Sequence, residues 1–258
     1  MLSGIFATIL AITLLINRDQ SNPTLLATII IGAGFMWLLA SIAYSSVHEE
    51  INDYTPANNK QKQGLIKRIT LVRSDKTFRN FIIARTLLLG TALASPIFVV
   101  MAYQVTPNAN SLITFIVAGT LATALSSFIW GHFSDKSSHL SMAIGGLVAA
   151  SAGITSILIF YLSPTLASAP YTWPLMFFLF NIGYMGVRIG RSTWVVDAAE
   201  GDKRTDYVAT SNTIIATLII MLGLIAAPLQ ALAPIYPMML YTGCCIIGSI
   251  VALRLKIN

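Results

Sequence analysis

Four polar side chains share one face of a stretch that is otherwise apolar. They follow one another at i, i+3, i+7 and i+10, the spacing of a single helical stripe: Asn181, Tyr184, Arg188 and Arg191. Polar groups inside a bilayer are costly, so they indicate function or contact with a neighbouring helix. We expect Asn181, Tyr184 and Arg188 to bind a polar or anionic substrate. The structural alternative is that Arg188 extends to the interface and Asn181 bonds a neighbouring helix.

Two residues of an earlier apolar run are further candidates for binding the substrate. Arg85 lies about 6 Å inside a run that begins at Phe81, at ~1.5 Å per helical residue. Its alternative is to extend to the inner interface. Ser95 precedes Pro96, where a helix could bend toward a cavity.

Small and weakly polar residues form two further stripes. Gly183, Gly186 and Gly190 recur at helical spacing, so neighbouring backbones could approach closely there or the helix could bend. A second stripe consists of Thr210, Thr213 and Thr217, with Asn212 beside it. Threonines often bond their own helix carbonyls, so this second stripe is weak evidence for a site.

Other kinds of chemistry find no support. All ten Asp and Glu residues and all three His residues lie in connecting segments, so no acid within an apolar run is available for proton coupling. Cys244 and Cys245 are adjacent in an apolar run, where small packing residues are the simpler interpretation. Metal-ligand clusters, buried acid pairs and serine–histidine pairs are missing. We therefore expect no enzyme, no catalytic residue, no metal and no cofactor; a channel would need a pore-lining repeat or charged ring that is not visible.

The elements that carry these residues are apolar segments long enough to cross a membrane. The chain of 258 residues is 55% hydrophobic and only 10% charged, whereas soluble domains are about one quarter charged. A helix needs about 20 apolar residues to cross the bilayer, and helices satisfy their own backbone groups there. Eight runs fit: 2–16, 24–45, 81–103, 112–130, 140–162, 173–189, 208–229 and 235–253. We predict an all-α polytopic membrane protein with eight transmembrane helices.

The connecting segments differ in charge. Thirteen of the sixteen Lys and Arg residues lie in segments 48–80, 131–139, 191–207 and 254–258. The opposite connections, 18–23, 104–110, 163–171 and 230–234, hold one basic residue between them. Basic loops remain in the cytoplasm. We therefore expect both termini in the cytoplasm and an integral protein of the bacterial inner (plasma) membrane.

Two basic connections resemble those of the major facilitator superfamily of transporters. The first matches its G-x-x-x-D-(R/K)-x-G-(R/K)-(R/K) loop at Gly131, Asp135 and Lys136, and departs from it after that. The second, from Arg191 through Asp197 to Arg204, is similar to the connection that follows the family's fourth and tenth helices. The resemblance implies that these six residues gate conformational change. Gly131 would take a left-handed conformation or permit close backbone approach, Asp135 would face a helix N-terminus, and Lys136 would face a helix C-terminus or lipid phosphate. The structural alternative is an ordinary polar turn with a helix-capping Asp135.

The resemblance also implies a domain organisation and a function. Residues 1–47 would be two helices of the N-terminal bundle, 48–80 a basic cytoplasmic linker and 81–258 the six-helix C-terminal bundle. The family has twelve helices, so four would be missing from the front, and the first run is short at 15 residues. We expect a transporter, secondary active or facilitative, that moves an unidentified small molecule by alternating access.

Partners follow from the same considerations. The lipid bilayer is one, and nucleic acid is not expected because the basic residues form no separate domain. The alternative function is a truncated or split transporter that is inactive alone. It would then need a partner chain or a homo-oligomer to supply the missing helices.

Overall fold

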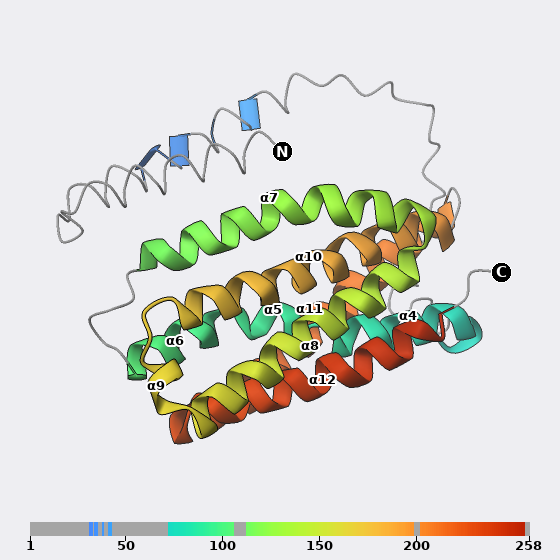
Figure 1. The fold of residues 1–258 in the computed structure, drawn as a ribbon. Coiled ribbons are helices and arrows are strands. Elements are labelled where there is room, and N and C mark those ends of the chain that lie inside the picture. Colours follow the sequence, from blue (N-terminus) through green and yellow to red (C-terminus); the bar gives the residue numbers. More distant parts are fainter. Residues whose placement is uncertain are drawn as a thin grey trace.

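The described part of the chain is a bundle of helices. In the computed structural model, the residues described are 31, 32, 34, 35, 38, 41, 42, 72–105, 112–198 and 202–255. The predicted run 2–16, most of the run 24–45 and most of the linker 48–80 lie outside them. Within the described residues the named elements, all helical, lie side by side along their length (Figure 1): α4 (Lys76–Leu87), α5 (Gly90–Leu93), α6 (Ser95–Val105), α7 (Leu112–Lys136), α8 (Ser138–Leu162), α9 (Pro164–Ala167), α10 (Thr172–Ala198), α11 (Asp202–Leu232) and α12 (Ile235–Leu253).

Five of the predicted runs fall in helices that are long and apolar enough to cross a membrane. These helices cover Lys76–Val105, Leu112–Lys136, Ser138–Leu162, Asp206–Leu232 and Ile235–Leu253. They indicate an integral membrane protein. The sixth run lies in α10, which has 27 residues but is not among the five. Asn181, Tyr184 and Arg188 lower the hydropathy of α10, and they are the residues for which we expect a function.

The first of these spans is broken twice. α4 ends at Leu87, a single turn forms α5, and α6 begins at Ser95. The second break coincides with Pro96, which has no N–H to donate within a helix. At the first break, a methyl group on Gly90 would lie 2.7 Å from the backbone carbonyl oxygen of Tyr241 in α12. Glycine therefore lets α5 approach the α12 backbone, and the bend expected near Ser95 and Pro96 is confirmed.

α8 packs against both α10 and α12 through small residues. A methyl group on Gly145 of α8 would lie 2.7 Å from the Val187 nitrogen of α10, and one on Gly190 would lie 2.7 Å from the Met142 nitrogen of α8. On its other side, Gly146 of α8 contacts the Ser249 side chain of α12. Such close contact is how helices associate in lipid, where apolar burial gives little driving force. The expected close approach of a neighbouring backbone is confirmed at Gly183 and Gly190, whereas Gly186 packs against the Trp130 side chain of α7.

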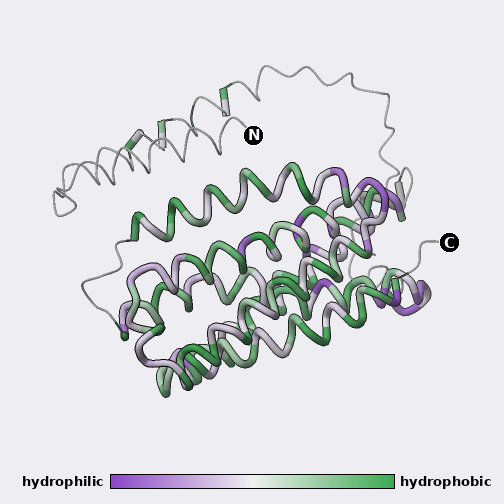
Figure 2. Tube along the Cα trace, in the orientation of Figure 1, coloured by the Kyte–Doolittle hydropathy of each residue, from purple (hydrophilic) through white to green (hydrophobic). Residues whose placement is uncertain are grey.

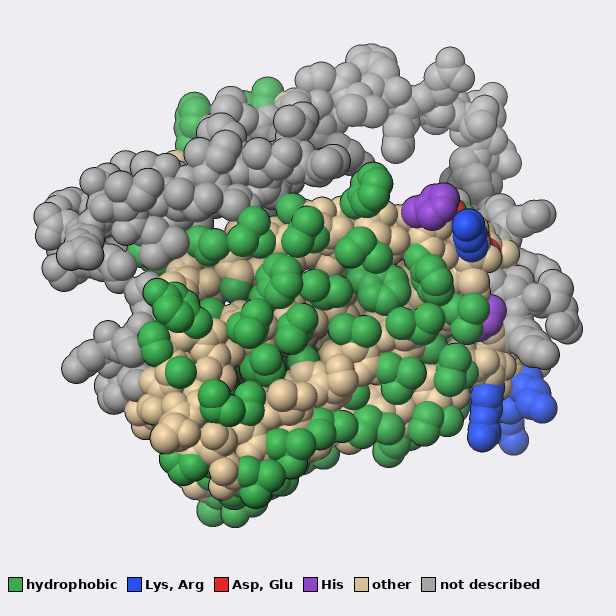
Figure 3. All heavy atoms as spheres, viewed as in Figure 1, with side chains coloured by type: hydrophobic (Ala, Val, Ile, Leu, Met, Phe, Trp, Pro, Cys, Tyr) green, Lys and Arg blue, Asp and Glu red, His purple; other side chains and the backbone are tan. Residues whose placement is uncertain are grey.

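The charged residues gather at one end of the bundle. Apart from Arg85, Arg188 and Arg191, every Lys, Arg, Asp and Glu residue that the structure describes lies at or near one of five helix ends: the starts of α4 and α11 and the ends of α7, α10 and α12. Figure 2 shows hydrophilic residues concentrated there. In Figure 3 the Lys, Arg and His side chains lie at that end, and hydrophobic side chains cover the flank of the bundle. This distribution matches a bundle with apolar sides and one charged end.

The helices at the charged end are longer than we predicted. α7 continues to Lys136 and α8 begins at Ser138, so the expected loop over 131–139 is reduced to Ser137. The left-handed turn predicted at Gly131 is wrong, because Gly131 lies within α7. A helix can reverse at one extended residue, and Ser137 has φ −162° and ψ 97°. α10 likewise extends to Ala198, beyond Arg191 and Asp197.

Candidate functional site

One face of α10 carries the predicted polar stripe past three other helices. Asn181, Tyr184 and Arg191 are half-buried, and Arg188 is exposed. The opposite face of α10 is closed against α8 by glycines, and Trp130 of α7 donates a hydrogen bond from Nε1 to the Ile182 oxygen at 2.9 Å. α10 is thereby fixed on two sides. Its polar stripe lies between α7 on one side and α4 and α11 on the other.

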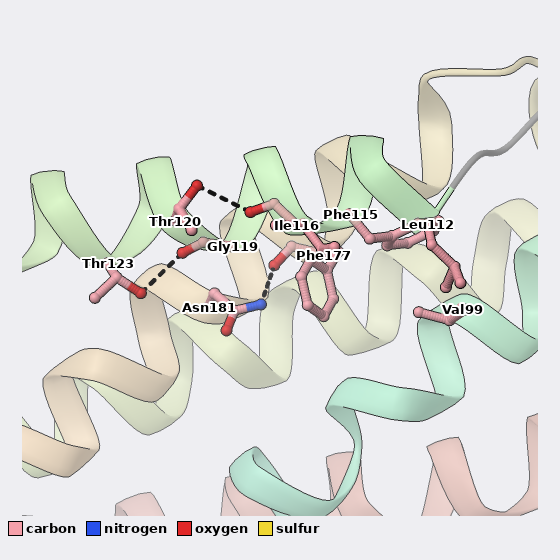
Figure 4. Close-up of a pocket in the computed structure, with 9 residues that line it drawn as sticks. All are labelled: Val99, Leu112, Phe115, Ile116, Gly119, Thr120, Thr123, Phe177 and Asn181. Carbon is pink, nitrogen blue, oxygen red and sulfur yellow. Dashed lines mark hydrogen bonds between the residues drawn. The ribbon is translucent and has the colours of Figure 1, made fainter. Parts of the chain in front are cut away.

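Asn181 is one of the residues that line an open apolar cavity of about 450 Å³. Its lining comes from α6, α7 and α10 (Figure 4): Val99, Leu112, Phe115, Ile116, Gly119, Thr120, Thr123, Phe177 and Asn181. The two threonines donate their hydroxyls to carbonyls of α7, and Asn181 donates from Nδ2 to the Phe177 oxygen at 2.9 Å. These polar groups are therefore satisfied within their own helices. Among the described residues no donor is found for the amide oxygen of Asn181, which could therefore accept from a ligand.

Arg85 joins α4 to α11. Its Nη1 donates to Ser211 Oγ at 2.6 Å and its Nη2 donates to Asn212 Oδ1 at 2.9 Å. Ser211 Oγ in turn donates to the Val208 oxygen at 3.1 Å, so its lone pairs are free to accept from Arg85. Nε of Arg85 is buried and has no partner within the described residues. Arg85 therefore does not extend freely to the interface; it is held inside the bundle by neutral oxygens.

Three guanidinium groups and a phenol form a cationic cluster. Arg85 and Arg191 lie close enough for their charges to repel, and Arg191 interacts in the same way with Arg188. Tyr184 lies within electrostatic range of Arg191. Within the described residues, none of these arginines is paired with a carboxylate. The structure thus brings together Arg85 and three of the four residues of the predicted stripe.

A second contact between α4 and α11 was not predicted. Asp75 caps α4 by accepting from the Phe78 nitrogen at 2.9 Å, and Tyr207 of α11 donates its hydroxyl to the other carboxylate oxygen of Asp75. The Tyr207 ring also stacks on Phe78, with centroids 4.0 Å apart. The sequence signal for the cap was present, because Asp precedes a helix that starts one residue later. Nothing in the sequence indicated the tyrosine.

The remaining candidate residues lie apart from this cluster. Ser95 is half-buried at the first position of α6. Asp135 is exposed, and no contact with a helix N-terminus is found for it in the part of the chain that the structure describes. Lys136 lies in the last turn of α7, as expected. Asp197 is exposed on α10, and Arg204 lies in the first turn of α11.

The three threonines of the α11 stripe differ in their hydrogen bonds, and two of them bond their own helix as we expected. Thr213 and Thr217 donate to carbonyls of their own helix, at 2.9 and 3.2 Å. Thr210 is buried and its hydroxyl has no partner within the described residues. The residues of α11 that bond Arg85 are instead Ser211 and Asn212, one turn or less from the stripe.

Comparison with known proteins gives no relative for this chain. It matches no protein-family model, no curated protein and no solved structure. Function must therefore be argued from the site itself.

Proposed function

We propose that this chain is a membrane transporter that moves a small molecule by alternating access. In this proposal it corresponds to the C-terminal eight helices of a major-facilitator fold, with α4 to α12 forming the six-helix bundle and α10 acting as a membrane-spanning helix. Both termini lie on the cytoplasmic side, because the basic residues gather at the charged end of the bundle. The broken span from α4 to α6 supports a role in transport, since transporters commonly place broken helices beside their substrate sites.

One observation carries the proposal: the cationic cluster within the bundle. Arg85 lies in the span Lys76–Val105, about 6 Å inside the apolar run that begins at Phe81, at ~1.5 Å per residue. An ionisable residue inside an apolar run is expensive and normally marks a path for substrate or ions. Arg85 is held by Ser211 and Asn212 without a neutralising carboxylate in the described residues. Its neighbour Arg191 lies on the same α10 stripe as Tyr184 and Asn181, and Asn181 borders the cavity.

Uptake by proteoliposomes tests the proposal. The full chain is reconstituted, a panel of labelled small polar and anionic solutes is offered, and uptake is compared with protein-free vesicles. For any solute taken up, Asn181→Ala and Tyr184→Ala should each reduce uptake about tenfold or more, since buried polar groups that bind substrate contribute at least 1.4 kcal/mol. Ser151→Ala, at an exposed residue of α8, is the matched control and should transport normally. Unchanged uptake in both α10 variants contradicts the site, and uptake of none of the solutes contradicts the transporter.

A second form of the proposal has the chain working with a partner chain or a second copy. Its support is the exposed polar side of α11, where Asn212, Thr213 and Thr217 are all exposed. Such groups are unfavourable against lipid and call for another helix or a water-filled cavity. Size measurement in detergent separates the two forms. A monodisperse monomer that transports in vesicles contradicts the partner-dependent form.

A further inference from the structure

The cavity and the cationic cluster are two ends of one surface, because α10 carries both. Asn181 belongs to the cavity, Arg188 lies seven residues further along the same face, and Arg191 ten residues further. At ~1.5 Å per residue these positions are about 10 and 15 Å from Asn181 along the helix. A single molecule of that length could contact both ends. Tyr184 lies between them and has a hydroxyl to offer along the way.

The two ends differ in chemistry. The cavity is lined mainly by aromatic, aliphatic and glycine residues, and its threonine hydroxyls are already bonded within α7. It therefore suits an apolar group. The other end carries three guanidinium groups that repel one another. An anion placed between them would relieve that repulsion.

The roles of the three arginines can be separated. Both terminal nitrogens of Arg85 already donate to α11, so Arg85 contributes positive charge and little free hydrogen-bonding capacity. Arg188 is exposed, and Arg191 is half-buried and within electrostatic range of both Arg85 and Tyr184. Their planar guanidinium groups match the two oxygens of a carboxylate or sulfonate. Arg188 and Arg191 are accordingly the residues that would contact the anion.

We propose that the ligand of this site is a small amphipathic anion, with its apolar group in the α6–α7–α10 cavity and its carboxylate or sulfonate at Arg188 and Arg191. This inference rests on the proposed function, since it names the substrate class of the same site. The cavity volume of about 450 Å³ lies in the range of small-molecule sites, roughly 300–1,000 Å³. The proposed ligand is a soluble molecule, and the competition experiment with anionic lipid below tests that choice.

Photolabelling with a matched pair of probes tests the ligand class. The full chain in phosphatidylcholine nanodiscs is irradiated with 4-benzoylbenzoate, an anion with an apolar diaryl ketone, or with the neutral 4-benzoylbenzamide, and labelled residues are mapped by mass spectrometry. The carboxylate should label cavity residues such as Ile116 and Phe177 at roughly tenfold lower concentration than the amide. Equal labelling by the two probes overturns the proposal.

Charge variants assign the anion end. Arg188→Gln and Arg191→Gln should each raise the concentration of 4-benzoylbenzoate needed for half-labelling about tenfold and leave the amide unchanged. Arg73→Gln removes the same charge from an exposed residue before α4 and should change neither probe. Arg188 is exposed, so its variant should fold even if that of Arg191 does not. A carboxylate preference that survives in Arg188→Gln, or that is lost equally in Arg73→Gln, overturns the assignment.

Two further arms separate the ligand source and the two proposals. Addition of phosphatidylglycerol to the nanodiscs should not compete with 4-benzoylbenzoate; strong competition would assign the site to anionic lipid and overturn the soluble ligand. Labelling as expected in a protein that takes up no solute would remove the transporter and keep the ligand class. Uptake confined to neutral or cationic solutes, with no preferential labelling, would keep the transporter and remove the anionic ligand class.

Discussion

The contacts of α8 with α10 and α12 and the contacts of α4 with α11 hold helices together in opposite ways. In the first, which we name the glycine seam (Gly145, Gly146, Gly183 and Gly190), α8 lies so close to the backbone of α10 and to the Ser249 side chain of α12 that a single methyl group has no room. In the second, the arginine junction (Asp75, Arg85, Tyr207, Ser211 and Asn212), long side chains reach between helices through hydrogen bonds. α11 itself is mostly exposed along its length.

The difference separates a rigid part of the bundle from a part that can move. Close-packed backbones have one arrangement and cannot slide without a clash. Hydrogen bonds made by flexible side chains can be exchanged for bonds to water or ligand at small net cost. The candidate site lies on the face of α10 opposite the glycine seam. Arg85 of the arginine junction lies near its Arg191 end. We expect the seam to keep its geometry during transport and the junction to change.

The largest expected effect comes from filling the seam. Gly183→Ala would place a methyl group 2.5 Å from the Gly145 oxygen and against the backbone of Ala149, which cannot move aside as a side chain could. We expect a loss of about 3 kcal/mol in stability, seen as a lower midpoint of thermal unfolding in detergent. The matched control is Gly223→Ala on α11, where no atom of another described helix lies within 4 Å of the added methyl. It should be neutral or stabilise by up to about 1 kcal/mol; equal effects would contradict the comparison.

Removing the arginine of the junction should cost less. Arg85→Ala deletes two charge-assisted hydrogen bonds, one to the buried hydroxyl of Ser211 and one to the exposed amide oxygen of Asn212, and we expect a loss of about 2 kcal/mol. Local protection should fall most in α11, so hydrogen exchange measured by mass spectrometry is the suitable readout. Arg85→Lys keeps the charge and loses the fork that reaches both Ser211 and Asn212. A uniform loss of protection across α8 and α12 would show that the junction is not a separate unit.

A smaller effect is expected from the tyrosine of the junction. Tyr207→Phe removes the hydroxyl that donates to Asp75 and keeps the ring that stacks on Phe78, so the loss should be about 1 kcal/mol. Asp75→Ala should cost more, because it also removes the cap of α4, worth about 1 kcal/mol. Thermal unfolding of the two single variants and the double variant measures the coupling. If the two losses simply add, the hydroxyl–carboxylate bond is not formed in the membrane.

The smallest effect on stability is expected at Asp135. The residue is exposed in the last turn of α7, where a negative charge gains nothing from the helix dipole. Asp135→Asn should change stability by less than about 0.5 kcal/mol. If Asp135 also gates transport, as the resemblance implies, uptake should slow while photolabelling stays unchanged. Unchanged uptake would restrict the working parts of the protein to the seam, the junction and the cavity.

Prediction from sequence succeeded where a residue's own chemistry decides the outcome. Five apolar runs were placed within helices of sufficient length because hydropathy alone requires it. Pro96 indicated a helix break because proline lacks an amide hydrogen, and the glycine stripe of α10 indicated close packing because only glycine permits it. The loop at 131–139 was predicted too long, because polarity was interpreted as a turn where α7 continues to Lys136. Polar residues are compatible with a helix when the helix extends beyond the membrane.

The sequence by itself determined the helical class, the apolar sides and the charged end, since each depends on composition summed along a segment. It also determined that Asn181, Tyr184, Arg188 and Arg191 share one face of α10. Only the tertiary structure decided that Arg85 reaches Ser211 and Asn212, more than 120 positions away in sequence. Only the tertiary structure placed the cavity beside Asn181. Contacts between distant segments depend on how helices pack, and packing depends on the shapes of many side chains at once rather than on any local pattern.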